Sequence, residues 1–172
     1  MANEEKYKFA YRFTGVASTG LSFIEDSLSR IMNDATDLAY LRPFYILLSY
    51  NFELILKSRV VMIEKFLDKN AIKDELRNLG HDIKKIGKKL GNTNLKDLGI
   101  KEIVENNQYK VTTIENKEVY VENFTKSRYD FLDDIMRNVD NQEHTRIKEY
   151  AEILFSILRK AGEKNEEAKN QI

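Results

Sequence analysis

A long apolar segment behind the chain's single proline constrains the fold more than any other feature. The 172 residues include only one proline and seven glycines, so helix is the expected structure. Pro43 has the place that proline prefers, in the first turn of a helix, and the segment from Phe44 to about Phe66 is apolar on nearly all sides up to Lys57. A helix that is apolar all round is buried by its neighbours. The sequence therefore predicts a mainly α fold with this helix as its centre.

Other segments have the period of amphipathic helices. Their apolar residues recur at steps of three and four, which places them on one helix face. These segments are 21–38, 76–90, 127–137 and 140–161. Gly80 is expected to break the second of them just before His81, and Gly91 to Asn94 is expected to end it. A short helix is predicted over 95–104.

The remaining segments predict other structure. Residues 109–114 and 118–122 are β-branched and aromatic, which favours a hairpin inserted at about 109–123 into a helical domain of residues 21–161. Aromatic residues alternate from Tyr7 to Phe13 in the manner of a strand, so residues 1–20 are predicted to form an N-terminal arm, either extended or the frayed start of a helix. The charged residues 162–172 are predicted to form a flexible tail.

The composition excludes several classes of function. Lysine plus arginine and aspartate plus glutamate number 28 each, so a whole-molecule field for nucleic acid is excluded and RNA could be held only by a local basic patch. Cysteine is absent and only two histidines occur, so we expect no metal site and no cofactor. A phosphate-binding glycine loop and a serine-hydrolase elbow are also missing.

The sequence carries no membrane signal. Its start is polar and acidic, with no apolar run behind it. The most apolar stretch, Phe44–Leu56, is too short to span a bilayer and is interrupted by Asn51 and Glu53. We therefore expect a cytoplasmic protein without membrane contact.

Two motifs resemble one branch of the HEPN superfamily. The apolar helix carries Glu53 and Lys57 four residues apart, and the sequence Gly80-His81-Asp82-Ile83 follows at the start of another helix. The later Ser127-Arg128-Tyr129-Asp130 also resembles a segment of that branch. Over residues 21–161 the resemblance implies an up-and-down helical bundle with the hairpin as an insertion, often paired as a homodimer. It also implies metal-independent RNA cleavage in a toxin–antitoxin, phage-defence or similar system, where an antitoxin or other partner protein is expected.

The superfamily's ribonuclease signature is an arginine with a polar neighbour, then four to six residues, then a histidine. Arg137-Asn138 with His144 fits this spacing, and Arg77 with His81 falls one residue short of it. In such a site the histidine assists the ribose 2′-hydroxyl and the arginine neutralises charge on the scissile phosphate. Lys84, Lys85, Lys88 and Arg128 are the candidate RNA-binding residues.

A structural interpretation stands beside each catalytic one. Glu53 and Lys57 have the spacing of a helical ion pair that could organise packing, and His81 or Asp82 could cap a helix. The lysines could be an ordinary solvated face. The competing function is therefore a non-catalytic dimerisation or protein-interaction domain. Catalysis predicts a histidine beside its arginine in an open cleft, whereas scaffolding predicts histidines that are buried or far apart.

Overall fold

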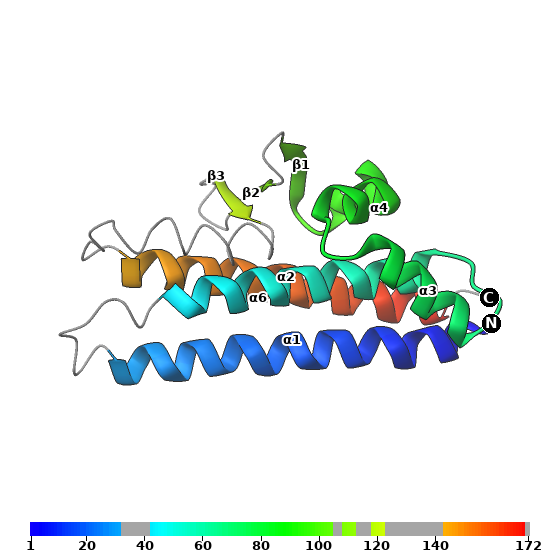
Figure 1. Cartoon of the computed structure of the whole chain (residues 1–172), viewed down its shortest axis with the longest axis horizontal. Coiled ribbons are helices and arrows are strands. Elements are labelled where there is room, and N and C mark those ends of the chain that lie inside the picture. Colours follow the sequence, from blue (N-terminus) through cyan, green and yellow to red (C-terminus); the bar gives the residue numbers. More distant parts are fainter. Residues whose placement is uncertain (32–41, 105–107, 113–117, 123–142, 171–172) are drawn as a thin grey trace.

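The computed structural model describes residues 1–31, 42–104, 108–112, 118–122 and 143–170 (Figure 1). Its helices are α1 (Asn3–Ile31), α2 (Arg42–Ile63), α3 (Lys69–Leu79), α4 (Ile83–Asp97) and α6 (Glu143–Asn170). Its strands are β1 (Ile100–Val104), β2 (Gln108–Thr112) and β3 (Glu118–Glu122). The mainly α fold class is confirmed. The helix predicted over 127–137 lies outside the described residues.

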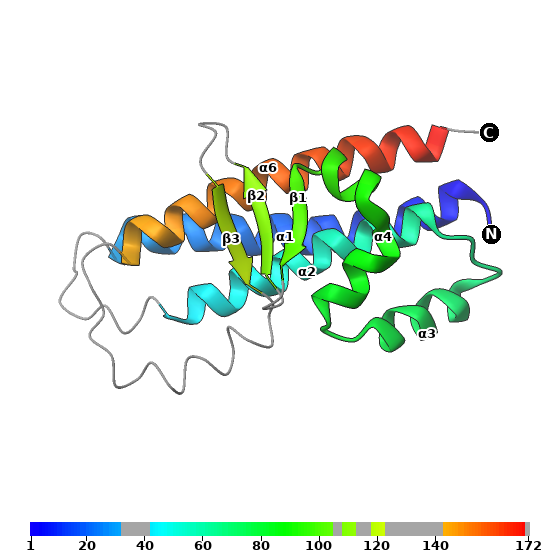
Figure 2. The ribbon, with the colours of Figure 1, turned by 90° about the horizontal axis from the view of Figure 1, so that it is seen from above.

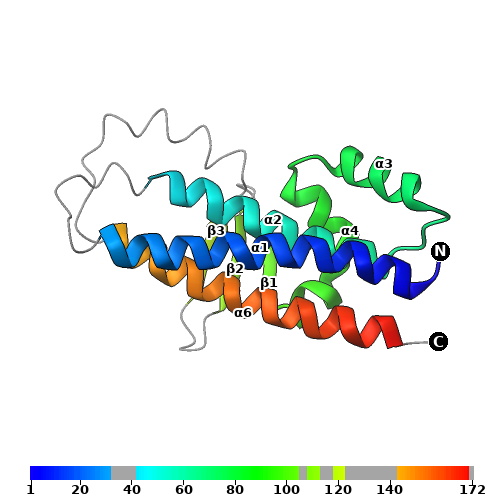
Figure 3. The same cartoon turned by 90° about the horizontal axis from the view of Figure 1, so that it is seen from below.

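Three long helices, α1, α2 and α6, pack side by side and form the core (Figures 1 and 3). α2 and α6 run in the same direction and α1 runs against them, so both chain termini lie at one end of the bundle. Fully buried residues such as Leu21, Phe52 and Leu154 join the three helices. α2 is the central helix that its composition predicts, because residues 51–62 are all buried.

Of the two alternatives predicted for residues 1–20, the extended arm was wrong and the start of a helix was closer, because residues from Asn3 onward form the first part of α1. The alternating aromatic residues flank the most buried side of the segment: Tyr7, Phe9 and Phe13 are partly buried against the core. That side carries Ala10 and Ala17, which are fully buried, whereas Tyr11 is 64% exposed. Small residues allow close packing between helices, so the helix was hidden behind aromatic residues on its flanks.

The prediction of a flexible tail over 162–172 was also wrong for the part described, since α6 continues to Asn170. The inward side of this segment carries a buried amide, Asn165, whose Oδ1 accepts a hydrogen bond of 2.8 Å from Arg59. Asn3 donates from Nδ2 to the carbonyl of Ala168 at 3.1 Å. The charges of this segment therefore belong to the outer faces of a packed helix.

The break expected at Gly80 separates α3 from α4, and Gly80 has a positive φ of 55°. Asp68 caps α3 by accepting the backbone N–H groups of Asn70 and Ala71, and Asp82 caps α4 by accepting that of Lys85 at 3.1 Å. The end predicted at Gly91 to Asn94 coincides with a break, because Gly91 has non-helical angles (φ 74°, ψ 161°), and a second helical stretch within α4 then continues to Asp97.

A three-stranded antiparallel sheet follows α4, in the order β1-β2-β3. β2 and β3 pair with Val111 opposite Val119, within the segment predicted as a hairpin. The prediction of a short helix over 95–104 was wrong beyond Asp97, because Gly99 with φ 82° turns the chain into β1. The sheet and α4 lie over α2 and α6, on the side away from α1 (Figures 1 and 2).

In the segments that the structure describes, no helix is both long enough and apolar enough to cross a membrane.

Candidate functional site

The buried part of α2 carries charged side chains, and these mark the candidate site. Glu53 is 1% exposed, Lys57 8% and Arg59 5%. Burying a charge is costly unless it is paired and hydrogen-bonded. The partners of these three residues therefore show how the surrounding helices are fixed.

Glu53 binds two partners, one from its own helix and one from the α3–α4 connection. Lys57 Nζ lies 2.7 Å from Glu53 Oε1 as an ion pair one turn along α2. His81 Nδ1 lies 2.9 Å from Oε2 and 3.1 Å from Oε1 of the same carboxylate. Because an ionised carboxylate only accepts hydrogen bonds, Nδ1 is the donor in this contact. The structure thus brings together Glu53, Lys57 and His81.

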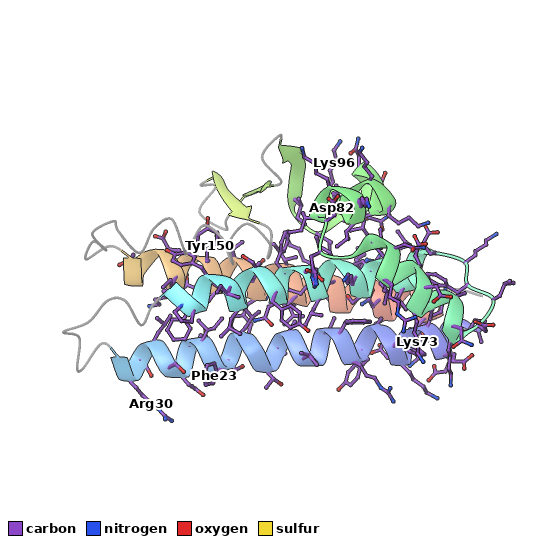
Figure 4. The ribbon with its side chains drawn as sticks, in the orientation of Figure 1. Phe23, Arg30, Lys73, Asp82, Lys96 and Tyr150 are labelled. Carbon is purple, nitrogen blue, oxygen red and sulfur yellow. The ribbon has the colours of Figure 1, made fainter. Side chains whose placement is uncertain are left out.

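The local sequence places His81 over α2. α3 ends at Leu79, Gly80 takes a backbone conformation that other residues rarely adopt, and Asp82 starts α4 as its N-cap (Figure 4). His81 is therefore held in a short connection between two fixed helix ends. Its side chain is 53% exposed while its partner Glu53 is almost completely buried, so the carboxylate fixes an imidazole that solvent can still reach.

Arg77 does not share a helix face with His81, as the second catalytic candidate requires. The helix ends between them at Leu79. Arg77 Nη1 pairs instead with Asp74 on the same helix at 3.5 Å, and its side chain is 79% exposed. The break at Gly80, which the sequence indicates, removes the geometric basis for this arginine–histidine pair.

The other sequence candidates lie largely outside the described residues. Arg128, Arg137 and Asn138 are not described, and His144 is placed only by its backbone, in the first turn of α6. The pairing of Arg137 with His144 remains a prediction.

The lysines of α4 differ in their surroundings. Lys85 and Lys88 are exposed. Lys89, one residue further, lies 3.1 Å from both Glu64 and Glu75, and hydrogen bonds to these two carboxylates raise its pKa. Lys84 is half-buried and has interactions of its own. Of the described basic candidates, Lys85 and Lys88 are therefore the most accessible to an RNA phosphate.

Sequence reasoning missed a second polar cluster around Arg59. Its Nη1 donates to Asn165 Oδ1 at 2.8 Å and its Nη2 donates to Asn94 Oδ1 at 3.0 Å. Asn165 Nδ2 in turn donates to Ser58 Oγ at 3.3 Å. An arginine so close to the apolar part of the central helix could have indicated a buried polar cluster. Asn94 and Asn165 gave none, because only the fold brings them to Arg59.

Comparison with known proteins gives no matching family model, no matching curated protein and no matching solved structure. Within the described ranges, histidine and carboxylate side chains form no group of three or more that could hold a metal ion.

Proposed function

We propose that this chain is a HEPN-like helical protein that cleaves RNA without a metal ion, acting in the cytoplasm as part of a toxin or defence system. The observation that carries the proposal is the His81 imidazole, half exposed and fixed through Nδ1 by the buried carboxylate of Glu53. A carboxylate that holds Nδ1 fixes the tautomer and the orientation of the ring, as it does for a histidine general base.

The chemistry needs few groups. The imidazole accepts the proton of a ribose 2′-hydroxyl, the 2′-oxygen attacks the adjacent phosphorus, and the bond to the 5′-oxygen breaks as that oxygen takes a proton from water. The imidazolium then returns its proton to solvent. The product ends in a 2′,3′-cyclic phosphate. Lys85 and Lys88 lie near the start of α4, a few residues after His81, and both are exposed. Their positive charges are placed to bind the phosphates of the RNA backbone. Arg137, Asn138 and His144 are the alternative catalytic set.

The test is cleavage of varied RNAs in EDTA by the purified protein and by His81→Ala and His144→Ala variants that keep the helical circular dichroism of the wild type. Loss of cleavage in one variant identifies the histidine at work, and a reduction of about 100-fold or more is expected for a general base. Lys73→Gln, on the exposed surface of α3, is the control. A wild type that cleaves no RNA at high enzyme concentration would overturn the proposal.

A second candidate, a non-catalytic dimerisation domain, is favoured by the outer face of α1. Val16 is 54% exposed and Phe23 57% exposed on this helix, and Arg30 points away from the bundle (Figure 4). Exposed residues recur there at alternating steps of four and three, the spacing of a helix-pairing seam. They are Arg12, Val16, Thr19, Phe23, Asp26 and Arg30.

This face is complementary to a second copy of itself. Two α1 helices packed antiparallel about Thr19 would place Arg12 opposite Asp26 of the other copy, and Phe23 opposite Gly15. A Cβ built on Gly15 meets nothing within 4 Å, so this position has room for a partner's ring. A homodimer would then bury Val16 and Phe23 near its centre and pair Arg12 with Asp26, while Arg30 would lie opposite Lys8 at the outer edges.

Light scattering after size exclusion tests the dimer. We expect a dimer for the wild type and a monomer for Phe23→Ser, with Lys73→Gln remaining dimeric. Asp26→Arg should also give a monomer, and the double variant Arg12→Asp with Asp26→Arg should restore the dimer, because exchange of both charges returns the complementarity. A monomeric wild type at high concentration contradicts this candidate.

A further inference from the structure

A cavity of about 750 Å³ lies where the ends of four helices meet, and it is separate from the Glu53–His81 contact. It is lined by residues near the start of α1 and near the ends of α2, α4 and α6, at the end of the bundle that holds both termini (Figure 3). Its volume is in the usual range for small-molecule sites, about 300–1,000 Å³.

Two nearly buried cations line this cavity, and each is held by neutral partners. Arg59 is bound through its two terminal nitrogens to the amide oxygens of Asn165 and Asn94. Lys6, 7% exposed, donates from Nζ to the carbonyl oxygens of Met62 at 2.8 Å and Glu64 at 3.2 Å. In the part of the chain that the structure describes, neither cation has a carboxylate within ion-pair distance. Two positive charges are therefore fixed in the lining of one cavity without a direct counter-ion.

Arg59 also retains donors that the fold does not use. A guanidinium has five N–H donors, and hydrogen bonds to the two asparagines account for two of them. The Nε atom of Arg59 is buried and has no hydrogen-bond partner in the described residues. Buried donors of this kind are rare because leaving one unsatisfied costs about 1–3 kcal/mol. The asparagines thus hold Arg59 in place and leave its Nε–H without a partner in the described residues.

The electrostatics of the cavity favour an anion. Burial lowers the pKa of Arg59, opposed by the more distant charges of Asp97 and Glu167. Burial also lowers the pKa of Lys6, opposed by Glu64. On the cavity wall Glu167 is already paired with Lys164 at 2.7 Å. Burial disfavours the charged forms of Arg59 and Lys6, and a bound anion would stabilise these charged forms again.

We propose that this cavity binds the phosphate group of a small molecule, with the phosphate oxygens on Arg59 and Lys6. A phosphate presents several acceptor oxygens at once, which suits a guanidinium with an unsatisfied donor in a cavity that an ammonium also lines. The cavity has space for more than a free phosphate ion, and the Asp97 carboxylate in its wall can accept hydrogen bonds from hydroxyl groups. A sugar phosphate is therefore the expected ligand, and inorganic phosphate is the minimal one.

Titration calorimetry with ribose 5-phosphate, inorganic phosphate and ribose tests this site. We expect ribose 5-phosphate to bind and to raise the unfolding temperature, inorganic phosphate to bind more weakly, and ribose not to bind. If ribose 5-phosphate and inorganic phosphate bind equally well, the cavity still recognises phosphate, and the free phosphate ion is then its ligand.

The variants Arg59→Lys and Lys6→Gln should each weaken binding about tenfold or more, the contribution of one hydrogen bond to a charged group. Lys73→Gln, a lysine outside the cavity, should bind like the wild type. In nitrogen-15 spectra the Arg59 Nε–H signal should shift as phosphate is added, a readout that remains if Arg59→Lys folds poorly. The absence of binding to either phosphate, binding of ribose alone, or equal binding by Lys6→Gln would overturn the proposal. RNA cleavage is measured separately, so failure of one proposal leaves the other standing.

Discussion

At the scale of single residues, Glu53 is the best-connected charge of the described core. It lies inside the central helix and binds Lys57 from α2 and His81 from the α3–α4 connection. Removal of one partner of a buried ion pair leaves an uncompensated charge, and this costs more than the pair itself contributes to stability. The carboxylate therefore fixes His81 whether the imidazole acts as a base or as a packing residue.

Glu53→Gln should lower the free energy of unfolding by about 2–4 kcal/mol, because Lys57 stays buried without its counter-ion. Asp74→Asn is the matched control, since it removes the carboxylate of an ion pair whose two side chains are exposed. It should cost less than about 0.5 kcal/mol. Urea unfolding of both variants gives the comparison. Equal losses of unfolding free energy in the two variants would mean that the buried ion pair contributes no more to stability than the exposed one.

At the scale of elements, the contact of α1 with α2 depends on a glycine. A Cβ built on Gly20 would lie 2.5 Å from Asn51 Oδ1 and 2.7 Å from Asn51 Nδ2, closer than side chains approach one another. Asn51 is 2% exposed, so its side chain has little space in which to move. The helices can approach this closely only because α1 has no side chain at this position.

Gly20→Ala and Gly15→Ala should therefore have effects of opposite sign. Both glycines lie inside α1, where alanine is a better helix former by about 0.5–1 kcal/mol. At Gly15 nothing lies within 4 Å of the new methyl group, so the variant should gain that amount. At Gly20 overpacking should exceed the gain and cost about 1–2 kcal/mol overall. Thermal unfolding measures both, and a stabilised Gly20→Ala would contradict the close contact.

At the scale of the whole molecule, the two ends of the chain hold each other. A hydrogen bond to Glu166 raises the pKa of Tyr7 to about 12, and the same bond lowers the pKa of Glu166. Lys169 lies 4.7 Å from the centre of the Tyr7 ring and 3.6 Å from Glu4. The first turns of α1 and the last turns of α6 are thus joined by side chains on the surface.

Tyr7→Phe should destabilise the fold in a defined pH window. The raised pKa of Tyr7 means that its contribution is complete below pH 10 and is lost as the pH rises through about 12. The lowered pKa of Glu166 means that the contribution is lost again as acid protonates the carboxylate. Unfolding of wild type and variant should therefore differ at neutral pH and converge in acid. A difference that stays constant from neutral to acidic pH would contradict this hydrogen bond.

The pattern of apolar residues was enough to predict the helical class, the central position of α2 and the break at Gly80, because each depends on residues close together in the chain. The same reasoning failed for the start of α1, where small alanines are fully buried and the aromatic residues are only partly buried beside them or exposed. It also failed at Gly99, since a helix pattern that continued past Asp97 hid the turn into β1. In both cases the packing partner decided the conformation.

The sequence by itself determined the elements that local periodicity encodes and the Glu53–Lys57 ion pair, which needs only one turn of helix. Tertiary structure alone decided that His81 joins this pair and that Asn94 and Asn165 hold Arg59 beside a cavity. Arg59 and Asn165 are 106 residues apart, so no local pattern relates them. Helix periodicity follows from the geometry of neighbouring residues, whereas the partners of a buried charge follow from how distant helices pack.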